Sequence, residues 1–156
     1  MAEELVLLDR YLDIEKARFG TRLEVVRRVP PALETCLVPT LMLQPVVENA
    51  IRHGIEPHAR PGRVELSAQE SGGMLTVMVA DNGGGMPEGQ PSREGVGLSN
   101  TRKRLEQLYG KRQRLWFSTT EGGGVKVTIE LPVRRREAND PAPDHLLLTR
   151  DPANQD

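Results

Sequence analysis

The segment Glu48-Asn49-Ala50-Ile51-Arg52-His53-Gly54 decides the interpretation of this sequence, together with two segments that follow it. The second is Asp81-Asn82-Gly83-Gly84-Gly85-Met86, and the third is Gly95-Val96-Gly97-Leu98-Ser99-Asn100. Taken alone each segment is a weak signal, because an asparagine on a helix or a glycine-rich loop usually serves a cap or a turn. All three in this order and so close together are hard to produce by chance, so we expect them to build one site.

Hydrophobic periodicity predicts three helices, which span residues 3–19, 39–54 and 98–109. Gly20 and Gly110 follow the first and the last of these helices in the manner of C-terminal caps. The middle segment contains Pro45, whose ring clashes with a continuing helix and which lacks a backbone donor. Pro45 therefore either kinks that helix or starts a new one.

Alternating apolar and polar residues predict five strands, which span residues 23–29, 64–69, 75–81, 115–119 and 125–131. The second and third strands form one hairpin, and the fourth and fifth form another. We assign the glycines between their arms to turns, namely Gly72, Gly73, Gly122, Gly123 and Gly124. Residues 33–38 fit neither pattern, and the glycine-rich residues 82–97 are interpreted as a loop.

Helices set among hairpins favour an α+β fold, a two-layer sandwich whose mixed, mostly antiparallel sheet is covered on one face by helices. We divide the chain into an N-terminal linker helix (1–20), a central domain (21–133) and a C-terminal tail (134–156) whose prolines and aspartates indicate disorder. The run Arg134-Arg135-Arg136 is interpreted as a solvated end. The leading helix either continues a dimer coiled coil or packs on the sheet.

A chain of 156 residues with a formal net charge of -1 suits one domain and offers no global basic field for nucleic acid or an anionic membrane. Its single cysteine, Cys36, cannot form an internal disulfide, which indicates a reducing compartment and a buried thiol that serves packing. Neither a signal peptide nor an apolar run of about 18 residues is visible. We therefore expect this piece to be soluble and cytoplasmic.

The first segment carries oxygen and nitrogen groups suited to phosphates and a hard cation. Asn49 can offer its side-chain oxygen to Mg²⁺, which takes few protein ligands and completes its shell with phosphates and water. Arg52 and His53 follow three and four residues later, so they share the helix face of Asn49 and could contact phosphate.

The other two segments supply what the base and the phosphates need. Asp81 ends a strand, where its carboxylate could accept the adenine amino hydrogen. Gly83 and Gly85 allow the close backbone approach that a purine edge requires, in the segment that Met86 ends. Gly95-Val96-Gly97-Leu98 precedes a helix whose N-terminal N–H groups favour an anion. The sequence therefore predicts a site for ATP with Mg²⁺.

At these residues the chain resembles the ATP-binding catalytic domain of sensor histidine kinases, in a superfamily that includes DNA gyrase, Hsp90-type chaperones and MutL. The likeness is closest to the LytS-type kinases, which typically show segments like Tyr11–Phe19 and Val38–Gly54. The resemblance covers roughly residues 4–132. It implies the Bergerat fold and makes residues 21–133 the ATP-binding catalytic domain.

The resemblance also implies roles for individual residues. Asn49 would be the Mg²⁺ ligand in the N box, Asp81 the adenine anchor in the G1 box, and residues 86–95 a short ATP lid. Gly95 and Gly97 would lie at the phosphates in the G2 box. The complete expected ATP site comprises Asn49, Arg52, His53, Asp81, Gly83, Gly85, Met86, Gly95, Val96, Gly97 and Leu98.

Departures from the family pattern also have consequences. Hydrolysing members carry a glutamate one turn before the metal-binding asparagine, whereas this chain has Pro45, so we expect poor intrinsic ATPase activity. Glu48 is a second candidate, beside Asn49, for a catalytic role, polarising a water near the metal; a structural role on the helix is the alternative. Arg102 and Arg104 either reach the phosphates or are solvated.

The resemblance implies that the γ-phosphoryl group of ATP passes to a histidine in a phosphoacceptor region resembling Pro-His-Phe-Leu-Phe-Asn, a string absent from this chain. The chain is therefore expected to be a piece of a longer kinase that is homodimeric in full length, can be an integral membrane sensor, and acts on a cognate response regulator. Two alternatives stay open: a non-catalytic ATP-binding regulatory module of the same fold, and an ATPase like gyrase or MutL.

Overall fold

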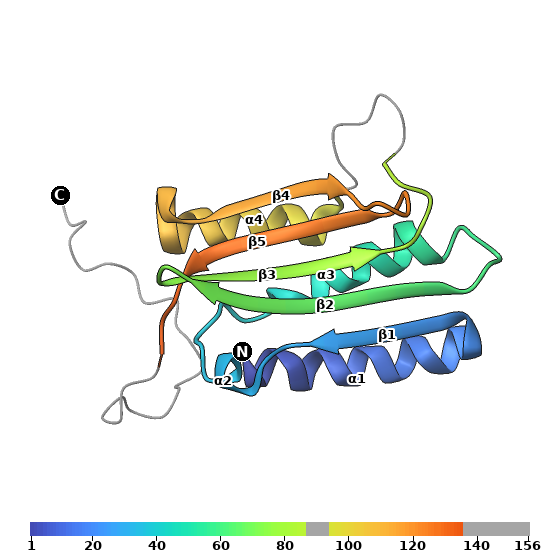
Figure 1. The fold of residues 1–156 in the computed structure, drawn as a ribbon, viewed down its shortest axis with the longest axis horizontal. Helices are drawn as coiled ribbons and strands as arrows, with labels where there is room; N and C mark the ends of the chain where they lie inside the picture. Colours follow the sequence, from blue (N-terminus) through green and yellow to red (C-terminus); the bar gives the residue numbers. More distant parts are fainter. Residues whose placement is uncertain (87–93, 136–156) are drawn as a thin grey trace.

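In a computed structural model, which describes residues 1–86 and 94–135, a five-stranded sheet forms one layer and helices form the other (Figure 1). The strand order is β1-β2-β3-β5-β4. β1 pairs with β2 in parallel, and the other neighbours pair antiparallel. The strands are β1 (Leu23–Arg28), β2 (Gly62–Ser71), β3 (Met74–Asp81), β4 (Arg114–Thr119) and β5 (Val125–Pro132). The predicted α+β sandwich with its five strands is thus confirmed.

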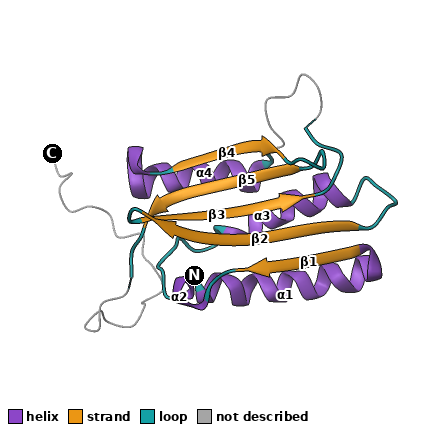
Figure 2. Cartoon of the chain, viewed as in Figure 1, coloured by secondary structure: helices purple, strands orange, loops and turns teal. Residues whose placement is uncertain are grey.

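The helices all lie on the same face of this sheet, as Figure 2 shows. They are α1 (Ala2–Phe19), α2 (Pro31–Glu34), α3 (Leu43–Ala50) and α4 (Val96–Tyr109). Two 3₁₀ turns, Gly20–Arg22 and Gly110–Arg112, follow α1 and α4, and Ile51–Ile55 continues α3 as a turn of π-helix. Among the described residues no helix combines the length and the apolar character that crossing a membrane requires.

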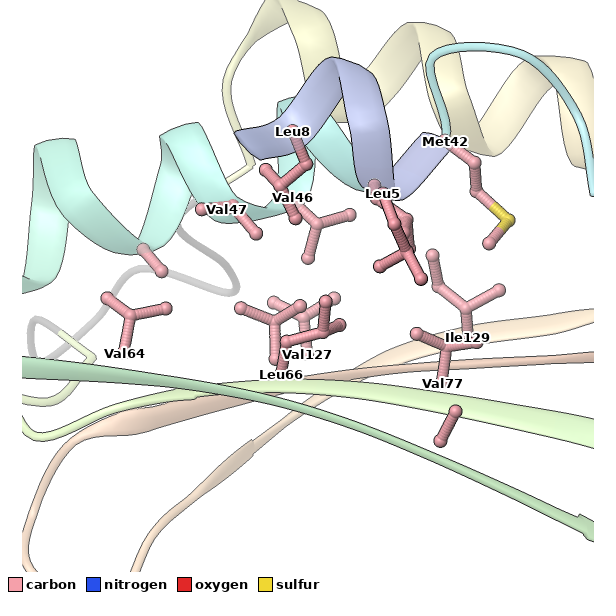
Figure 3. Packing of buried hydrophobic residues seen from close by; sticks show 14 of the residues in the cluster. Leu5, Leu8, Met42, Val46, Val47, Val64, Leu66, Val77, Val127 and Ile129 are labelled. Carbon is pink, nitrogen blue, oxygen red and sulfur yellow. The ribbon is translucent and has the colours of Figure 1, made fainter. Parts of the chain in front are cut away.

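The core lies between the two layers, where every second side chain of the sheet points toward the helices (Figure 3). In β3 the buried positions alternate strictly along the strand and end at Asp81. Val64 and Leu66 of β2 extend the same surface, and Val46 and Val47 of α3 pack against it. The period of two that predicted these strands is therefore the pattern of one buried sheet face.

The helix predicted over residues 39–54 is shorter than expected, because it begins only at Leu43. Leu41 lies just before it with a φ of 57°, a left-handed conformation that no α-helix contains. Pro45 falls in the first turn, where backbone N–H groups have no acceptor within the helix, so it starts the helix and does not kink it. The apolar residues just before Leu43 therefore belong to a turn, in which Met42 is buried and Leu41 is exposed.

The leading helix packs on the sheet, one of the two expectations stated for it. Leu5, Leu8, Leu12 and Phe19 of α1 are buried in the common core. α1 ends at Phe19, and the Gly20 that follows has a φ of 56°, which matches the expected glycine cap. The helix that we assigned to a linker thus shares the hydrophobic core of the central domain.

Residues 33–38 and the arginine run, which the sequence patterns did not assign to a helix or strand, meet beside α2. Residues 33–38 contain the end of α2 and an isolated bridge between Cys36 and Arg135. Cys36 is fully buried, as expected of a packing thiol. Arg134 and Arg135 are exposed, as expected of a solvated end, and both also contact the domain: Arg134 lies over the ring of Tyr109, and Arg135 pairs with Glu70. The rest of the expected tail lies outside the described residues.

Candidate functional site

The helical segment from α3 into the π-helix presents the polar side chains that the sequence singled out. Asn49 is only 7% exposed although it is polar, whereas Glu48 and Arg52 are exposed and His53 is half-buried. A π-helical turn is rare and is often found at functional sites, where it shifts side chains relative to the preceding helix. Here it begins at Ile51, directly after Asn49-Ala50.

A groove of about 240 Å³ brings two of the three predicted segments together. One wall comes from α3 and the π-helix, and the other comes from the first turn of α4. The lining residues are Pro45, Glu48, Asn49, Arg52, His53, Gly95, Val96, Gly97 and Leu98. The structure therefore collects the predicted catalytic and metal residues and the phosphate candidates of the first and third segments on one surface.

The N-terminus of α4 forms the part of the groove suited to an anion. Gly95 precedes the helix in extended conformation, and the first helical hydrogen bond runs from the Ser99 N–H to the Gly95 carbonyl at 3.0 Å. The N–H groups of the intervening turn therefore have no acceptor within the helix, and no acidic residue lies in that turn. Leu98 is 2% exposed, so its side chain belongs to the core and only its backbone is available to a ligand.

Glycine keeps this helix start open. A Cβ atom at Gly95 would meet nothing within 4 Å, and a Cβ at Gly97 would meet only Pro45, at 3.4 Å. Neither glycine has the positive φ that would demand glycine for backbone reasons. Both glycines line the groove, so their missing side chains leave the backbone of the helix start accessible there.

Asp81 is held at the end of β3 in a dense backbone cradle. The residue is 5% exposed, and its Oδ1 accepts hydrogen bonds from the N–H groups of Gly83, at 2.8 Å, and Val125, at 3.3 Å. A Cβ at Gly54 would lie 2.5 Å from the Asp81 Cγ, and one at Gly83 would overlap the Gly54 carbonyl. The carboxylate orientation is thus fixed by glycines on both sides.

Two glycines serve this cradle in ways that the sequence did not reveal. Gly124 was assigned to a turn, yet a Cβ there would overlap the Asp81 carbonyl, so this position needs glycine for packing under Asp81. Gly83 has no positive φ and packs against Gly54, whereas Gly85 has a φ of 79° and lies against the Gly123 carbonyl. The turn assignment does hold for Gly72, Gly73 and Gly123, which have positive φ.

The loop after Asp81 is anchored to β2 by residues that sequence reasoning missed. The Arg60 guanidinium donates to the carbonyls of Asn82 and Gly83, at 2.9 and 3.1 Å. Asn82 Oδ1 accepts from the Arg63 N–H at 2.7 Å. Arg60 stands in a loop without any motif, so no pattern in the sequence could have pointed to it.

Arg102 and Arg104, which were expected either to reach the phosphates or to be solvated, contact other described residues of the chain. Arg102 makes a two-pronged ion pair with Glu94, with its NH2 nitrogen 2.9 Å from Oε2, and donates to the Leu115 carbonyl at 2.8 Å. The hydrogen bond to Glu94 raises the pKa of the Arg102 guanidinium above its ordinary value. Arg104 donates to the Thr40 carbonyl. Both arginines thus hold neighbouring segments in place.

We expect Arg102 and Glu94 to act on stability as one unit. In urea denaturation of Arg102→Gln, Glu94→Gln and the double variant, the coupling free energy should be about 0.5–1 kcal/mol, the upper range for a partly exposed bidentate pair. Lys103→Gln, an exposed neighbour on the same helix, is the matched control and should change stability by less than about 0.5 kcal/mol. Additive effects of the two substitutions would show that the pair does not stabilise the fold.

Met86 is half-buried at the end of the glycine segment. The expected ATP lid over residues 86–95 falls mostly outside the described residues, which resume at Glu94. Next to this segment Gly85 lies against the Gly123 carbonyl, and within it Glu94 pairs with Arg102.

A family model described as histidine kinase-, DNA gyrase B- and HSP90-like ATPase matches residues 38–135, and the chain belongs to this family. Among curated relatives, the sensor histidine kinase YesM of Bacillus subtilis is 33% identical over 136 residues, which make up 85% of this chain and 23% of the relative. The sensor histidine kinase BtsS of Escherichia coli is 34% identical, covering 86% of this chain and 24% of the relative. The sensor protein LytS of Bacillus anthracis is 34% identical, covering 85% and 24%.

Solved structures give the same answer for the fold. The catalytic domain of histidine kinase ThkA matches with a TM-score of 0.60 at 20% identity, covering 83% of this chain and 92% of that domain. The mycobacterial sensor histidine kinase MprB matches with a TM-score of 0.59 at 19% identity, covering 85% and 95%. The predicted resemblance to sensor histidine kinases of the LytS type is confirmed, and the chain spans about a quarter of the length of these three curated relatives.

Proposed function

We propose that this chain is the ATP-binding catalytic domain of a sensor histidine kinase, which passes the γ-phosphoryl group of ATP to a histidine imidazole in a phosphoacceptor region outside this sequence. One observation carries the proposal: a single groove joins Asn49, Arg52 and His53 to the open N-terminus of α4. Cationic and N–H groups converge there on the space where a triphosphate would lie. The domain's contribution would be positioning and charge neutralisation.

The donor set of the groove fits Mg²⁺ bound together with a nucleotide. Asn49 offers one amide oxygen at the groove, which is the sparse protein contribution that Mg²⁺ takes when phosphates and water fill its other positions. When bound, the ion would neutralise phosphate charge. Asp81, whose orientation is fixed by two backbone N–H groups, would bind the adenine amino group, and Arg52 and His53 would contact phosphate oxygens.

Two lining residues bear on whether bound ATP would be hydrolysed. Pro45 lines it beside Gly97, and a proline side chain has no group that could activate a water. Glu48 is the carboxylate in the lining, is exposed, and would be the residue to polarise a water there. An ATPase like gyrase or MutL would require fast turnover of ATP by this chain alone.

Several wider assignments belong to the same proposal. The parent protein would be a homodimer whose phosphoacceptor histidine receives the phosphoryl group and delivers it to a response regulator, and its sensor part can lie in a membrane. Within this chain, residues 21–133 would form the catalytic unit and residues 1–20 would connect it to the preceding part. The common core of α1 and the sheet supports a tight connection.

Asn49→Ala is expected to remove the Mg²⁺-dependent part of ATP affinity. The loss of one ligand oxygen to a cation should weaken Mg-ATP binding roughly 10- to 100-fold, the range for a hydrogen bond or contact that involves a charge. Binding of ATP in EDTA should stay unchanged, because Asp81 and the start of α4 are intact. Calorimetric titrations with and without Mg²⁺ measure both quantities, and Gln107→Ala, an exposed amide on α4, is the control.

The transfer reaction itself is tested by mixing this chain with the parent's phosphoacceptor segment and γ-labelled ATP. Acid-labile label on the segment, which disappears when its histidine is replaced, is the expected result. Tight ATP binding without transfer would favour the regulatory module of the same fold. Rapid phosphate release without any partner would favour the hydrolysing ATPase.

A further inference from the structure

A buried carboxylate from α1 caps the helix that carries Asn49. Glu4 is 4% exposed, and its two oxygens accept the backbone N–H groups of Leu41, Met42 and Leu43, at 2.6, 2.7 and 3.0 Å. These donors come from a segment that is far from Glu4 in the sequence. Glu4 thus joins α1 to the turn that opens α3.

This contact supplies what α3 lacks locally. The residue before the helix is Met42, whose side chain cannot accept a hydrogen bond from the first turn. Leu41 has a φ of 57°, a conformation that costs about 1–2 kcal/mol for a residue other than glycine, so the surrounding contacts must hold it in place. The Glu4 carboxylate holds the N–H of this same residue, and it lies where the positive end of α3 meets the first turn of α1.

The cap lies close to the groove along a short, stiff helix. Asn49 follows Leu43 by six residues, which places it roughly 9 Å farther along the axis at 1.5 Å per residue. Pro45, in the intervening turn, lines the groove and packs against Gly97 of α4. A shift of the N-terminus of α3 would therefore change the distance between Asn49 and the phosphate-facing backbone of α4.

The adenine side of the site is fixed differently. Asp81 is oriented by N–H groups from Gly83 and Val125, which belong to the loop after β3 and to β5. Neither donor is part of α1 or α3, and the contact of Asp81 on that side is with Gly54, in the π-helix at the end of α3 farthest from Glu4. Loss of the Glu4 cap should thus disturb the Mg²⁺ and phosphate part of the site more than the adenine part.

We propose that Glu4 is a positioning residue that sets the place of Asn49 relative to the start of α4, so that Mg²⁺-dependent ATP binding depends on how α1 is seated. The inference rests on the proposed function, because it assigns Mg²⁺ to Asn49. The position of α1 would thereby affect the nucleotide site. Displacement of α1 in the parent protein would remove the Glu4 carboxylate from three backbone donors at once.

The test compares Glu4→Gln with Glu3→Gln, its exposed neighbour in the same helical turn. Glutamine keeps the size of the side chain but replaces one acceptor oxygen by a donor and removes the charge. Two readouts are needed, ATP affinity with Mg²⁺ and in EDTA, and amide hydrogen exchange of residues 43–50. Glu4→Gln should weaken Mg-ATP binding roughly tenfold, the effect of one charged hydrogen bond, leave the affinity in EDTA unchanged, and speed exchange in α3. Glu3→Gln should change neither.

Other outcomes would overturn the proposal. Equal losses of affinity with and without Mg²⁺ would assign Glu4 to general stability, and unchanged Mg-ATP affinity in the folded variant would show that the cap does not position the site. Should Glu4→Gln fail to fold, Glu4→Asp, which retains the charge on a shorter side chain, decides the matter by the same two affinities. If the unaltered chain binds no Mg-ATP, the proposed function itself falls, and the positioning role with it.

Discussion

Asp81→Asn is expected to reduce ATP affinity roughly 100-fold while the domain stays folded, the loss that follows when a charged buried hydrogen bond is replaced by an unfavourable one. Asparagine has nearly the same shape as aspartate, and its remaining oxygen can still accept the N–H groups of Gly83 and Val125. Its NH₂ group, however, is a donor where the adenine amino group also donates. Two donors cannot bind each other.

Calorimetry with ATP and with adenosine separates this effect from the phosphate contacts. Both ligands should lose affinity by a similar factor, because Asp81 contacts the base that they share. Asp13→Asn, an exposed aspartate on α1, removes the same charge elsewhere and should leave both affinities unchanged. Loss of ATP binding with normal adenosine binding would show that Asp81 does not anchor the base.

Gly124→Ala should destabilise the domain by about 3 kcal/mol, at the upper end of the usual range for overpacking a dense site. The added methyl group would overlap the backbone carbonyl of Asp81, which cannot move without disturbing the pairing of Asp81 with Val64 of β2. The same displacement would rotate the Asp81 carboxylate, so ATP affinity should fall as well. Urea denaturation and calorimetry give the two quantities.

The same turn offers a matched control two residues away. A Cβ at Gly122 would meet nothing within 4 Å, and Gly122 has no positive φ, so Gly122→Ala should change stability by less than about 0.5 kcal/mol. Equal effects of the two substitutions would mean that glycine serves the turn itself and that the packing against Asp81 is unimportant. This comparison distinguishes two roles that look identical in the sequence Glu121-Gly122-Gly123-Gly124.

Strands β2 and β3 could be predicted well because their buried positions alternate along one sheet face. Leu75, Val77 and Val79 predict β3 and its end at Asp81 from their spacing alone. The start of α3 could not be predicted in this way, since Leu41 and Met42 continue the apolar stripe of the helix while their backbone follows a turn. That turn depends on Glu4, a tertiary contact that periodicity does not contain.

The candidate site shows the same division. Asn49 and Gly97 stand in local motifs, and the structure places them on one groove as expected, although their roles toward a ligand stay predictions. The contributions of Arg60 and Gly124 lie in contacts between segments far apart in the sequence. The residue types alone did not indicate these roles, because an arginine in a loop and a glycine in a turn both have ordinary local explanations.

The cradle around Asp81 also has a consequence for the order in which the molecule folds. The β2–β3 hairpin is local and can form early, but the bond from the Val125 N–H to Asp81 spans 44 residues and requires β5 to have joined the sheet. Non-local pairings of this kind form slowly. We therefore expect nucleotide binding to be recovered only with the last refolding phase. ATP can then stabilise the folded domain but cannot promote the early folding steps.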